Sequence, residues 1–354
     1  RQAALAMRRF VGAVVAWNAV GSASAGACDS RTFQVQGLKN VFLAGSAGSI
    51  APGGSSVMLG HGDFTSIVSS CAAPNNDPWH ITPFRLLGAT LSYTADLSRV
   101  GCACNLAVYL VSAPARDWNG NPSKGRGDYY CDANQVGGQW CPEVDIMEAN
   151  NHVFQATPHK CNPPQGQGHY TWCDRAGCGD STKNMGQAYG MGAAYKIDTT
   201  KPFQVSTTFD SDGGQLVGFR TKLSQEGREV WLGSCASDYL RQLTGALDEG
   251  MSLIFSYWGD SPQTMAWLDM PPCGQQGCYG PNAGAGIISD LAVTNAAGVP
   301  PPPTPAPTAP PPVAPRQDPE LTRLDARHGI IRWRNHPELC LTMGPGGSSL
   351  SLHG

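Results

Sequence analysis

The sequence predicts an all-β protein, an antiparallel two-sheet β-sandwich with a concave substrate cleft. Short runs rich in β-branched and aromatic residues recur along the chain, and turns rich in Gly, Pro and Asp separate them. Such runs predict strands, no helical heptad pattern accompanies them, and about 270 residues between them can bury a substantial core. The segment Asp210–Gly214 reads as a hairpin turn rather than a calcium loop. The expected strands are Thr90–Ala95, Leu106–Val111, Glu143–Met147, Phe203–Phe209, Leu216–Thr221, Leu253–Tyr257, Met265–Asp269 and Ile287–Val293.

The strand expected at Glu143 carries three acids in a Glu-x-Asp-x-x-Glu pattern. In a regular strand Glu143 and Asp145 share a face, whereas Glu148 points the other way. One extra residue near Ile146–Met147 would form a β-bulge and return Glu148 to the first face, and bulges are enriched beside active sites. We therefore expect all three carboxylates to face one cleft.

Three crowded carboxylates repel one another, so at least one should hold a proton near neutral pH. A retaining glycosidase needs that difference, because it uses an ionised nucleophile together with a protonated acid. The pattern thus indicates Glu143 as nucleophile, Glu148 as acid/base and Asp145 as the residue that tunes Glu143. The alternative is a solvated acidic strand with its charges turned outward.

Several segments together resemble glycoside hydrolase family 7, the cellobiohydrolases and β-1,4-endoglucanases of cellulose breakdown. Glu143–Asn150 is similar to the family's catalytic strand, which reads Glu-x-Asp-x-x-Glu-Ala-Asn, and Thr157–Cys161 is similar to its Thr-Pro-His-x-Cys segment. Glycoside hydrolase family 16, which acts mostly on β-1,3-glucans, shares only the first of these motifs. The other similar segments are Phe84–Gly88, Leu106–Ser112, Cys173–Cys178, Lys196–Lys201, Gly250–Trp258 and Met265–Asp269.

This resemblance implies a concanavalin-like jelly roll and supports the catalytic roles of Glu143, Asp145 and Glu148. It places His159 in the cleft near the acid/base. It also implies that large aromatic side chains serve as platforms for the apolar faces of sugar rings, at little conformational cost. The further substrate-binding residues that it implies are Asp132, Tyr109 and Asn134 as polar groups, and Trp258 and Trp267 as stacking platforms.

The chain also departs from the family. Gly168, Ala176 and Gln275 stand where the family has charged residues that hold the leaving-side sugars. Binding on that side is therefore expected to be weak, or rebuilt from neighbours such as His169 and Arg175.

The segment between Cys131 and Cys141 is far shorter than in the family, which removes part of the roof of the cleft. We therefore expect a retaining endoglucanase that cuts internal β-1,4-glucosidic bonds. The alternatives are a β-1,3- or mixed-linkage glucanase, a cellobiohydrolase, and a lectin-like protein that binds glucan without cutting it.

The expected partner is a polysaccharide, β-glucan or cellulose, and we expect a monomer without cofactor or metal. A net charge of −3 favours neither nucleic acid nor an anionic membrane as a partner.

Thirteen cysteines indicate an oxidising compartment, and twelve of them lie between Cys28 and Cys278. A zinc site at Cys102 and Cys104 or at Cys173 and Cys178 is the competing interpretation, and no second Cys/His pair with zinc spacing accompanies either. The resemblance implies the pairs Cys131–Cys141, Cys161–Cys173, Cys178–Cys235 and Cys102–Cys278, which leaves Cys104–Cys273 and Cys28–Cys71.

The sequence divides into four parts. Residues 1–27 read as a secretory signal peptide with some upstream residues, because Arg8 and Arg9 precede an apolar run and small residues. The protein is therefore expected to be secreted and extracellular. Residues 28–298 form the expected catalytic domain, and residues 299–319 a Pro- and Thr-rich linker. The tail, 320–354, faintly resembles the start of a ricin-type carbohydrate-binding module, or else is disordered; in the first case Cys340 would pair beyond Gly354.

Overall fold

The computed structural model describes residues 28–38, 41–46, 48–71, 80–124 and 129–295, and further on the backbone of 321–325, 330–333, 336–343 and 350–353. The side chains of 28–30, of 46 and of all residues after 295 lie outside this description, as do the expected signal peptide and linker. The chain separates into two compact units, Arg1–Pro303 and Thr304–Gly354. No helix among the described residues is long and apolar enough to cross a membrane.

The first unit contains two large, mainly antiparallel sheets, as the sequence predicts. One sheet has nine strands among the described residues, in the order β1-β2-β5-β17-β8-β9-β10-β11, with β6 beside β17. Its strands are β1 (Cys28–Phe33), β2 (Val41–Ser46), β5 (Phe64–Val68), β6 (Pro83–Phe84), β8 (Cys104–Val111), β9 (Glu143–Ala149), β10 (Phe154–His159), β11 (Asp180–Ser181) and β17 (Met251–Gly259).

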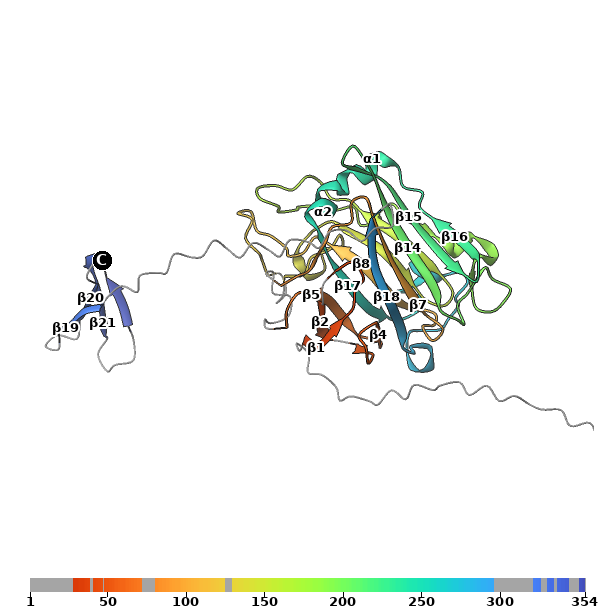
Figure 1. Ribbon diagram of the computed structural model, residues 1–354, viewed down its shortest axis with the longest axis horizontal. Coiled ribbons are helices and arrows are strands. Elements are labelled where there is room, and N and C mark those ends of the chain that lie inside the picture. The colour runs from red at the N-terminus through yellow and green to blue at the C-terminus, as the bar shows by residue number, and fades with distance from the viewer. Residues whose placement is uncertain are drawn as a thin grey trace, which may run out of the picture. The chain divides into compact units, whose positions relative to one another are not determined.

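The other sheet has seven strands in the described part of the chain, in the order β16-β15-β14-β7-β18-β4-β3. Figure 1 shows β7, β14, β15, β16 and β18 side by side in one layer and β5, β8 and β17 in the other. The strands of this sheet are β3 (Ser49–Ile50), β4 (Ser56–Leu59), β7 (Ala89–Asp96), β14 (Phe203–Asp212), β15 (Gln215–Gln225), β16 (Arg228–Leu232) and β18 (Gly286–Asn295).

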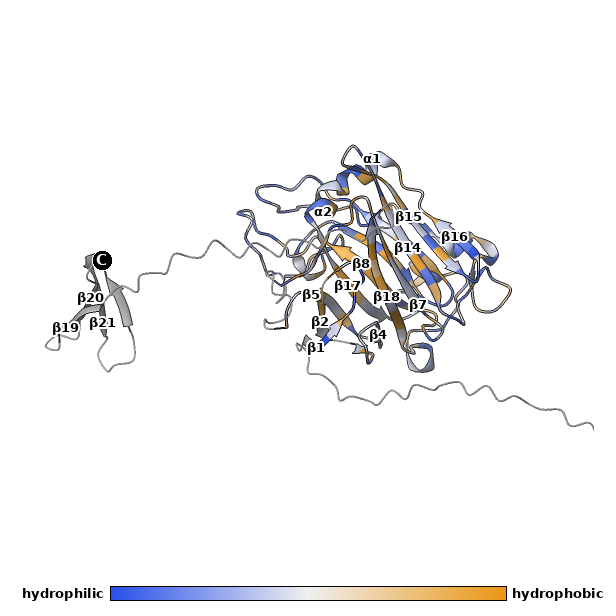
Figure 2. Cartoon of the chain, in the orientation of Figure 1, coloured by the Kyte–Doolittle hydropathy of each residue, from blue (hydrophilic) through white to orange (hydrophobic). Residues whose placement is uncertain are grey.

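The main hydrophobic core lies between the two sheets. Strand β7 alternates buried and half-buried residues, as a strand with one face in the core should. Strand β8 is buried at every position, and β17 at its first seven, because both faces of the central strands are covered. In the hydropathy colouring, hydrophilic and hydrophobic residues are mixed along β14 to β16 (Figure 2).

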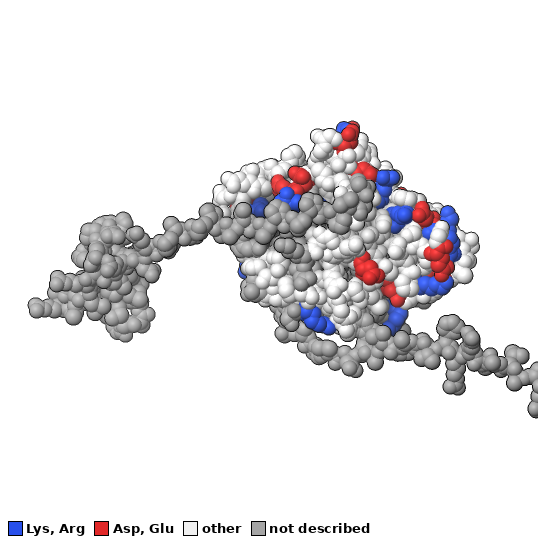
Figure 3. All heavy atoms as spheres, viewed as in Figure 1, with Lys and Arg blue, Asp and Glu red and all other residues white. Residues whose placement is uncertain are grey.

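The surface over β15 and β16 carries interspersed charges of both signs (Figure 3). They include the ion pairs Arg220–Asp210 and Lys222–Glu229. The predicted hairpin turn joins β14 to β15, where Gly213 and Gly214 have φ of 56° and 76°. Two left-handed residues suit a two-residue hairpin, so this part of the prediction is confirmed.

Seven of the eight expected strands are present, but the expected strand Met265–Asp269 is wrong. Its residues form the short helix α3 (Ala266–Asp269). The helix brings the fully buried Asp269 carboxylate to the backbone N–H of Ala103 (2.7 Å) and to the side chain of Asn150 (2.8 Å). The remaining short elements are α1 (Ser237–Leu240), α2 (Thr244–Glu249), β12 (Tyr189–Gly190), β13 (Ile197–Asp198), η1 (Val136–Gly138), η2 (Thr182–Asn184), η3 (Gly186–Ala188), η4 (Arg241–Leu243) and η5 (Gly280–Asn282).

Three expected disulfides, Cys131–Cys141, Cys161–Cys173 and Cys178–Cys235, are confirmed. The expected Cys102–Cys278 and Cys104–Cys273 pairs are wrong, because the structure joins Cys102 to Cys273 and Cys104 to Cys278.

Neighbouring contacts explain this exchange of partners. Cys104 lies opposite Gly259 in the sheet, and a side chain at Gly259 would meet Cys278. Asp269 binds both the residue after Cys102 and, through its carbonyl, the N–H of Cys273. Cys71 is also disulfide-bonded, whereas the expected partner Cys28 has its side chain outside the described residues.

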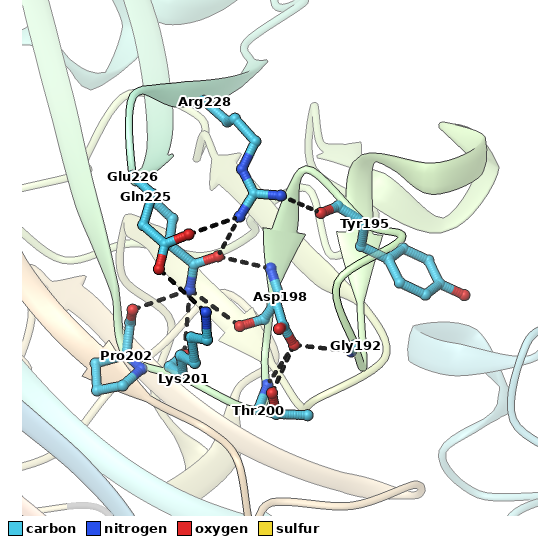
Figure 4. Close-up of polar contacts among 9 residues, drawn as sticks. All are labelled: Gly192, Tyr195, Asp198, Thr200, Lys201, Pro202, Gln225, Glu226 and Arg228. Atoms are coloured by element: carbon cyan, nitrogen blue, oxygen red, sulfur yellow. Dashed lines mark hydrogen bonds and ion pairs between the residues drawn. The ribbon is translucent and has the colours of Figure 1, made fainter. Parts of the chain in front are cut away.

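A polar network attaches the segment 192–202 to the turn between β15 and β16 (Figure 4). The buried side chain of Gln225 accepts the N–H of Asp198 (2.8 Å) and donates to the carbonyls of Asp198 and Pro202, each at 3.0 Å. Arg228 donates to the carbonyl of Tyr195 (2.9 Å). Because these backbone groups are satisfied by side chains, this segment stays ordered with little regular structure.

The second unit contains a four-stranded antiparallel sheet among its described residues, in the order β19-β20-β21-β22. The expected carbohydrate-binding module and the expected pairing of Cys340 depend on side chains outside the described residues. The strands are β19 (Leu321–Asp325), β20 (Ile330–Trp333), β21 (His336–Met343) and β22 (Leu350–His353).

Candidate active site

The predicted bulge is present in β9. Val108 lies opposite Met147 while the next residue of β8, Tyr109, lies opposite Asp145, so Ile146 has no partner across this pair. The pairing with β10 shifts at the same place. Val144, Ile146, Met147 and Ala149 all enter the main core, which leaves the three acids on the opposite, outer face of the nine-stranded sheet.

Asp145 and His159 form a buried pair on that outer face. The Nε2 atom of His159 lies 2.9 Å from Oδ2 of Asp145. The other ring nitrogen, Nδ1, lies 2.9 Å from the carbonyl oxygen of Asp174. Because a carbonyl can only accept, Nδ1 carries a hydrogen, and the Nε2–Oδ2 contact then requires one further proton. The pair therefore holds a proton next to the other acids, and burial together with Asp132 raises the pKa of Asp145 well above its usual value.

Glu143 lies beside this pair and is only 6% exposed. One ligand atom from each of Glu143, Asp145 and His159 lies within 4.8 Å of the others. Burial raises the pKa of Glu143, and the charges of Asp145 and Asp132 add to this. The backbone N–H of Ala133 opposes that rise by donating to Oε2 of Glu143 at 3.0 Å. Glu143 is thus an acid whose ionisation depends on the proton held by its neighbours.

Glu148 is the second acid with a distinct environment. Burial, followed by the charge of Asp145, raises its pKa to about 8. The side-chain amide of Asn105 donates to its Oε1 at 2.9 Å and favours the ionised form. Glu148 therefore holds a proton at neutral pH, as a general acid must.

The expected polar residues lie around Glu143. The hydroxyls of Tyr109 and Tyr130 are 3.1 Å apart, and Glu143 raises the pKa of both by charge repulsion, after burial. Asp132 is buried, and its Oδ1 accepts the backbone N–H groups of Asn134 and Val136, each at 2.9 Å. Asn134 itself is exposed.

Trp258 and Trp267 form an exposed aromatic surface. Their ring centroids are 6.2 Å apart at an interplanar angle of 24°, and their exposed fractions are 42% and 43%. Trp258 lies directly opposite Asn105 in the sheet, so the two side chains share a face. Since Asn105 binds Glu148, the tryptophans belong to the Glu148 end of the group of acids.

The two neighbours expected to replace the lost charged residues, His169 and Arg175, make different contacts. The guanidinium of Arg175 lies over the ring of Trp140, 5.0 Å from its centroid, and donates to the carbonyl of Asn134 at 3.2 Å. His169 packs instead against Trp118, with ring centroids 4.4 Å apart. Of the two expected substitutes, Arg175 is therefore the one in contact with the loop that binds Glu143.

Among the residues that the structure describes, two sets have donor atoms close enough to hold a metal ion. The set of Cys102, His152 and Cys273 is excluded, because its two cysteines form a disulfide. In the set of Glu143, Asp145 and His159, the His159 Nε2 atom already faces Asp145 at 2.9 Å. This contact makes the second set better suited to holding a proton than a cation.

Comparison with known proteins agrees with this geometry. The model of the Glycosyl hydrolase family 7 matches residues 127–235, which include all three acids and His159. Endoglucanase EG-1 of Hypocrea jecorina is 30% identical over 275 residues, which cover 65% of this chain and 58% of that protein. Over this segment the chain is similar to glycosyl hydrolase family 7.

A second relative, the probable endo-beta-1,4-glucanase celB of Aspergillus clavatus, is 30% identical over 242 residues, covering 55% of this chain and 58% of that protein. The chain thus spans less than two thirds of the length of these relatives. The fold is that of an endoglucanase I solved in complex with cellobiose (TM-score 0.57, 22% identity, 69% of this chain and 77% of that one). A family 7 cellobiohydrolase from Daphnia pulex shares it (TM-score 0.55, 21% identity, 72% and 80%).

Sequence reasoning missed three groups of the site. Asn105, Tyr130 and the backbone N–H of Ala133 contact Glu148, Tyr109 and Glu143 respectively. Strand alternation alone could have found Asn105, because it shares a face with Tyr109. The other two lie in an irregular loop, where the sequence carries no periodic signal.

Proposed function

We propose that this protein is a retaining endo-β-1,4-glucanase. The observation that carries the proposal is the bulge that brings Glu143 and Glu148 to one outer face, where Glu143 receives the backbone N–H of Ala133 and Glu148 the side-chain amide of Asn105. Retaining hydrolysis uses two carboxyl groups in this way, one as nucleophile and one as acid/base, and Glu148, with its pKa raised to about 8, can supply the proton. The family relatives named endoglucanase support the same substrate class.

In the first step, Glu143 attacks the anomeric carbon of the sugar and forms a covalent glycosyl ester. The bond from that carbon to the glycosidic oxygen breaks, and Glu148 gives its proton to the departing oxygen. In the second step, a water molecule loses a proton to Glu148 and attacks the same carbon, which releases Glu143 and restores both acids. Asp145 and His159 keep one proton next to Glu143, so that Glu143 need not share its site with an unscreened second negative charge.

Two finer points belong to the proposal. Cys131 and Cys141 lie ten positions apart in the sequence, and the short loop that they close favours an open site and internal cutting. The disulfides favour a secreted, extracellular protein.

The test is release of reducing ends from carboxymethyl cellulose and from a β-1,3-glucan, with Glu143→Gln and the exposed control Glu229→Gln beside the unchanged protein. We expect activity on cellulose, full activity of the control, and a loss of at least about a thousandfold in Glu143→Gln. Activity of Glu143→Gln near that of the unchanged protein would overturn the assignment. Activity on the β-1,3-glucan alone would change the linkage, and binding without release of ends would indicate a lectin.

Two further measurements test the stereochemistry and the position of cutting. The first sugar anomer released, followed by NMR, should be β, because two inversions at one carbon retain its configuration. Viscosity of the polymer should fall well before reducing ends accumulate. Viscosity that falls only in proportion to reducing ends would show attack from chain ends.

A further inference from the structure

The hydroxyl of Tyr239, in helix α1, joins two segments of the candidate active site. It donates to Oδ2 of Asp174 at 3.0 Å and accepts the backbone N–H of Lys160 at 3.3 Å. The carbonyl oxygen of Pro158 also lies 3.3 Å away. Pro158 and Lys160 are the residues directly before and after His159. One side chain from a distant part of the chain therefore contacts both neighbours of His159 and the residue whose carbonyl binds its ring.

The surroundings of Tyr239 make its hydroxyl a fixed donor to Asp174. Burial, and after it the carboxylate of Asp174, raises the pKa of Tyr239, so the hydroxyl keeps its hydrogen. A hydroxyl has only one hydrogen to give, and the nearer, charged acceptor binds it more strongly than a carbonyl does. The Nζ atom of Lys160 lies 4.8 Å from the centroid of the Tyr239 ring and holds that ring in place.

The turn 174–178 lies directly against the imidazole of His159. A Cβ atom at Gly177 would lie 2.7 Å from Nδ1 of His159, so this close approach requires a glycine. The carbonyl oxygen of Asp174 accepts from Nδ1 at 2.9 Å and from the backbone N–H of Gly177 at 3.2 Å. Because two donors share this oxygen, its direction depends on how Asp174 is held. The backbone N–H of Asp174 is bound by the carbonyl of Lys160 at 2.8 Å, and its side chain is bound by Tyr239.

We propose that Tyr239 is a positioning residue that sets the tautomer of His159 through Asp174. In a histidine, the partner of one ring nitrogen decides which nitrogen carries the hydrogen. With Nδ1–H bound to the carbonyl of Asp174, the contact between Nε2 and Asp145 requires a further proton, which leaves the pair neutral. Without that carbonyl, neutral His159 can carry its one hydrogen on Nε2 and donate it to Asp145, which leaves the pair negative.

The consequence for catalysis rests on the proposed function. A negative pair beside Glu143 opposes the ionisation of that carboxyl, because like charges repel. A smaller fraction of the molecules then holds an ionised nucleophile. Tyr239 therefore acts on the nucleophile through three intermediate residues, Asp174, His159 and Asp145, without contacting the substrate.

The first measurement is the tautomer of His159 in the full chain, from the NMR signals of isotope-labelled histidine nitrogens at neutral pH. The signals of His159 are assigned by their loss in His159→Gln. In the unchanged protein we expect Nδ1 to carry a hydrogen. Tyr239→Phe should raise the fraction of molecules with a bare Nδ1 about tenfold, because it removes a hydrogen bond to a charged group. Phenylalanine keeps the ring beside Lys160, so the variant changes the hydroxyl alone.

Tyr257→Phe is the matched control. It also removes a tyrosine hydroxyl, which donates to the carbonyl of Gly284 at 2.8 Å, but the ring of Tyr257 belongs to the main core between the sheets. The control should lower thermal stability and leave the signals of His159 unchanged. In hydrolysis of carboxymethyl cellulose, Tyr239→Phe should lower kcat about tenfold with little change in KM, and the control should keep its kcat.

A double-mutant cycle with Asp174→Ala tests the route of the effect. If Tyr239 acts through Asp174, then Tyr239→Phe has little further effect on the His159 signals once the Asp174 carboxylate is absent. Additive effects in this cycle would overturn the inference. An unchanged tautomer in Tyr239→Phe, or equal changes in Tyr239→Phe and Tyr257→Phe, would overturn it as well. Failure of the proposed function is seen separately, because the NMR signals need no substrate and Glu143→Gln would then still cut cellulose.

Discussion

Replacing Glu148 by glutamine should change how the stability of the folded protein depends on pH. The folded state raises the pKa of Glu148 from an ordinary 4.5 to about 8, chiefly by burial. Between these two values the folded chain binds a proton that the unfolded chain releases, so the free energy of unfolding of the unchanged protein falls as the pH rises. Glutamine cannot ionise, so the variant escapes this loss.

The size of the effect follows from the two pKa values. At about 1.4 kcal/mol per pH unit, the gap from 4.5 to about 8 corresponds to a loss of about 5 kcal/mol. The loss is absent below about pH 4.5 and complete above about pH 8. Relative to the unchanged protein, Glu148→Gln should therefore gain up to about 5 kcal/mol between acid and alkaline conditions.

The assay is urea unfolding of both proteins at a series of values from about pH 4 to about pH 9, with the disulfides intact. Glu229→Gln is the control, because Glu229 is exposed and pairs with Lys222 on the other sheet. The control should not show the gain expected of Glu148→Gln. A constant difference for Glu148→Gln would refute the reasoning, since it would mean that Glu148 titrates alike in both states.

Two other predictions concern single side chains. Asn105→Leu removes the amide that favours ionised Glu148, so the pKa of Glu148 should rise and the alkaline limb of kcat/KM should move from about pH 8 to higher pH. A limb in the pH–rate profile that stays in place or moves to lower pH would contradict the role of that contact. Gln225→Leu should lower the free energy of unfolding by about 3 kcal/mol, because it leaves the N–H of Asp198 and nearby carbonyls unpaired. In thermal unfolding, a loss no larger than that of the exposed Gln204→Leu control would argue against this.

Much of the fold follows from local patterns. Strand β7 alternates as a strand with one buried face must, and Asp210–Gly214 turns as its glycines require. The segment at Met265–Asp269 has the composition of a strand, yet it forms a helix. The deciding contacts, between Asp269 and the distant Ala103 and Asn150, are tertiary and leave no mark in the local sequence.

The candidate site likewise combines a feature that the sequence predicts with features that only the tertiary structure determines. The bulge could be predicted, because the spacing of Glu143, Asp145 and Glu148 puts them on one face only if one residue is added. The exchange of disulfide partners could not, since Cys102 and Cys104 are only two positions apart in the sequence, and the sheet register, which sets Cys104 opposite Gly259, decides which cysteine each one meets. The pKa values depend on burial, which composition does not give.

The unpaired Ile146 has a consequence for anyone who copies this site onto another scaffold. The three acids occupy one face only because the strand gains a residue between the second acid and the third. Grafting the same six-residue pattern onto a strand without a bulge would point the third acid into the interior, where burying an unpartnered carboxyl costs free energy. A regular strand would need the shorter pattern Glu-x-Asp-x-Glu. The arrangement of the three acids therefore depends on the β-bulge as much as on the acids themselves.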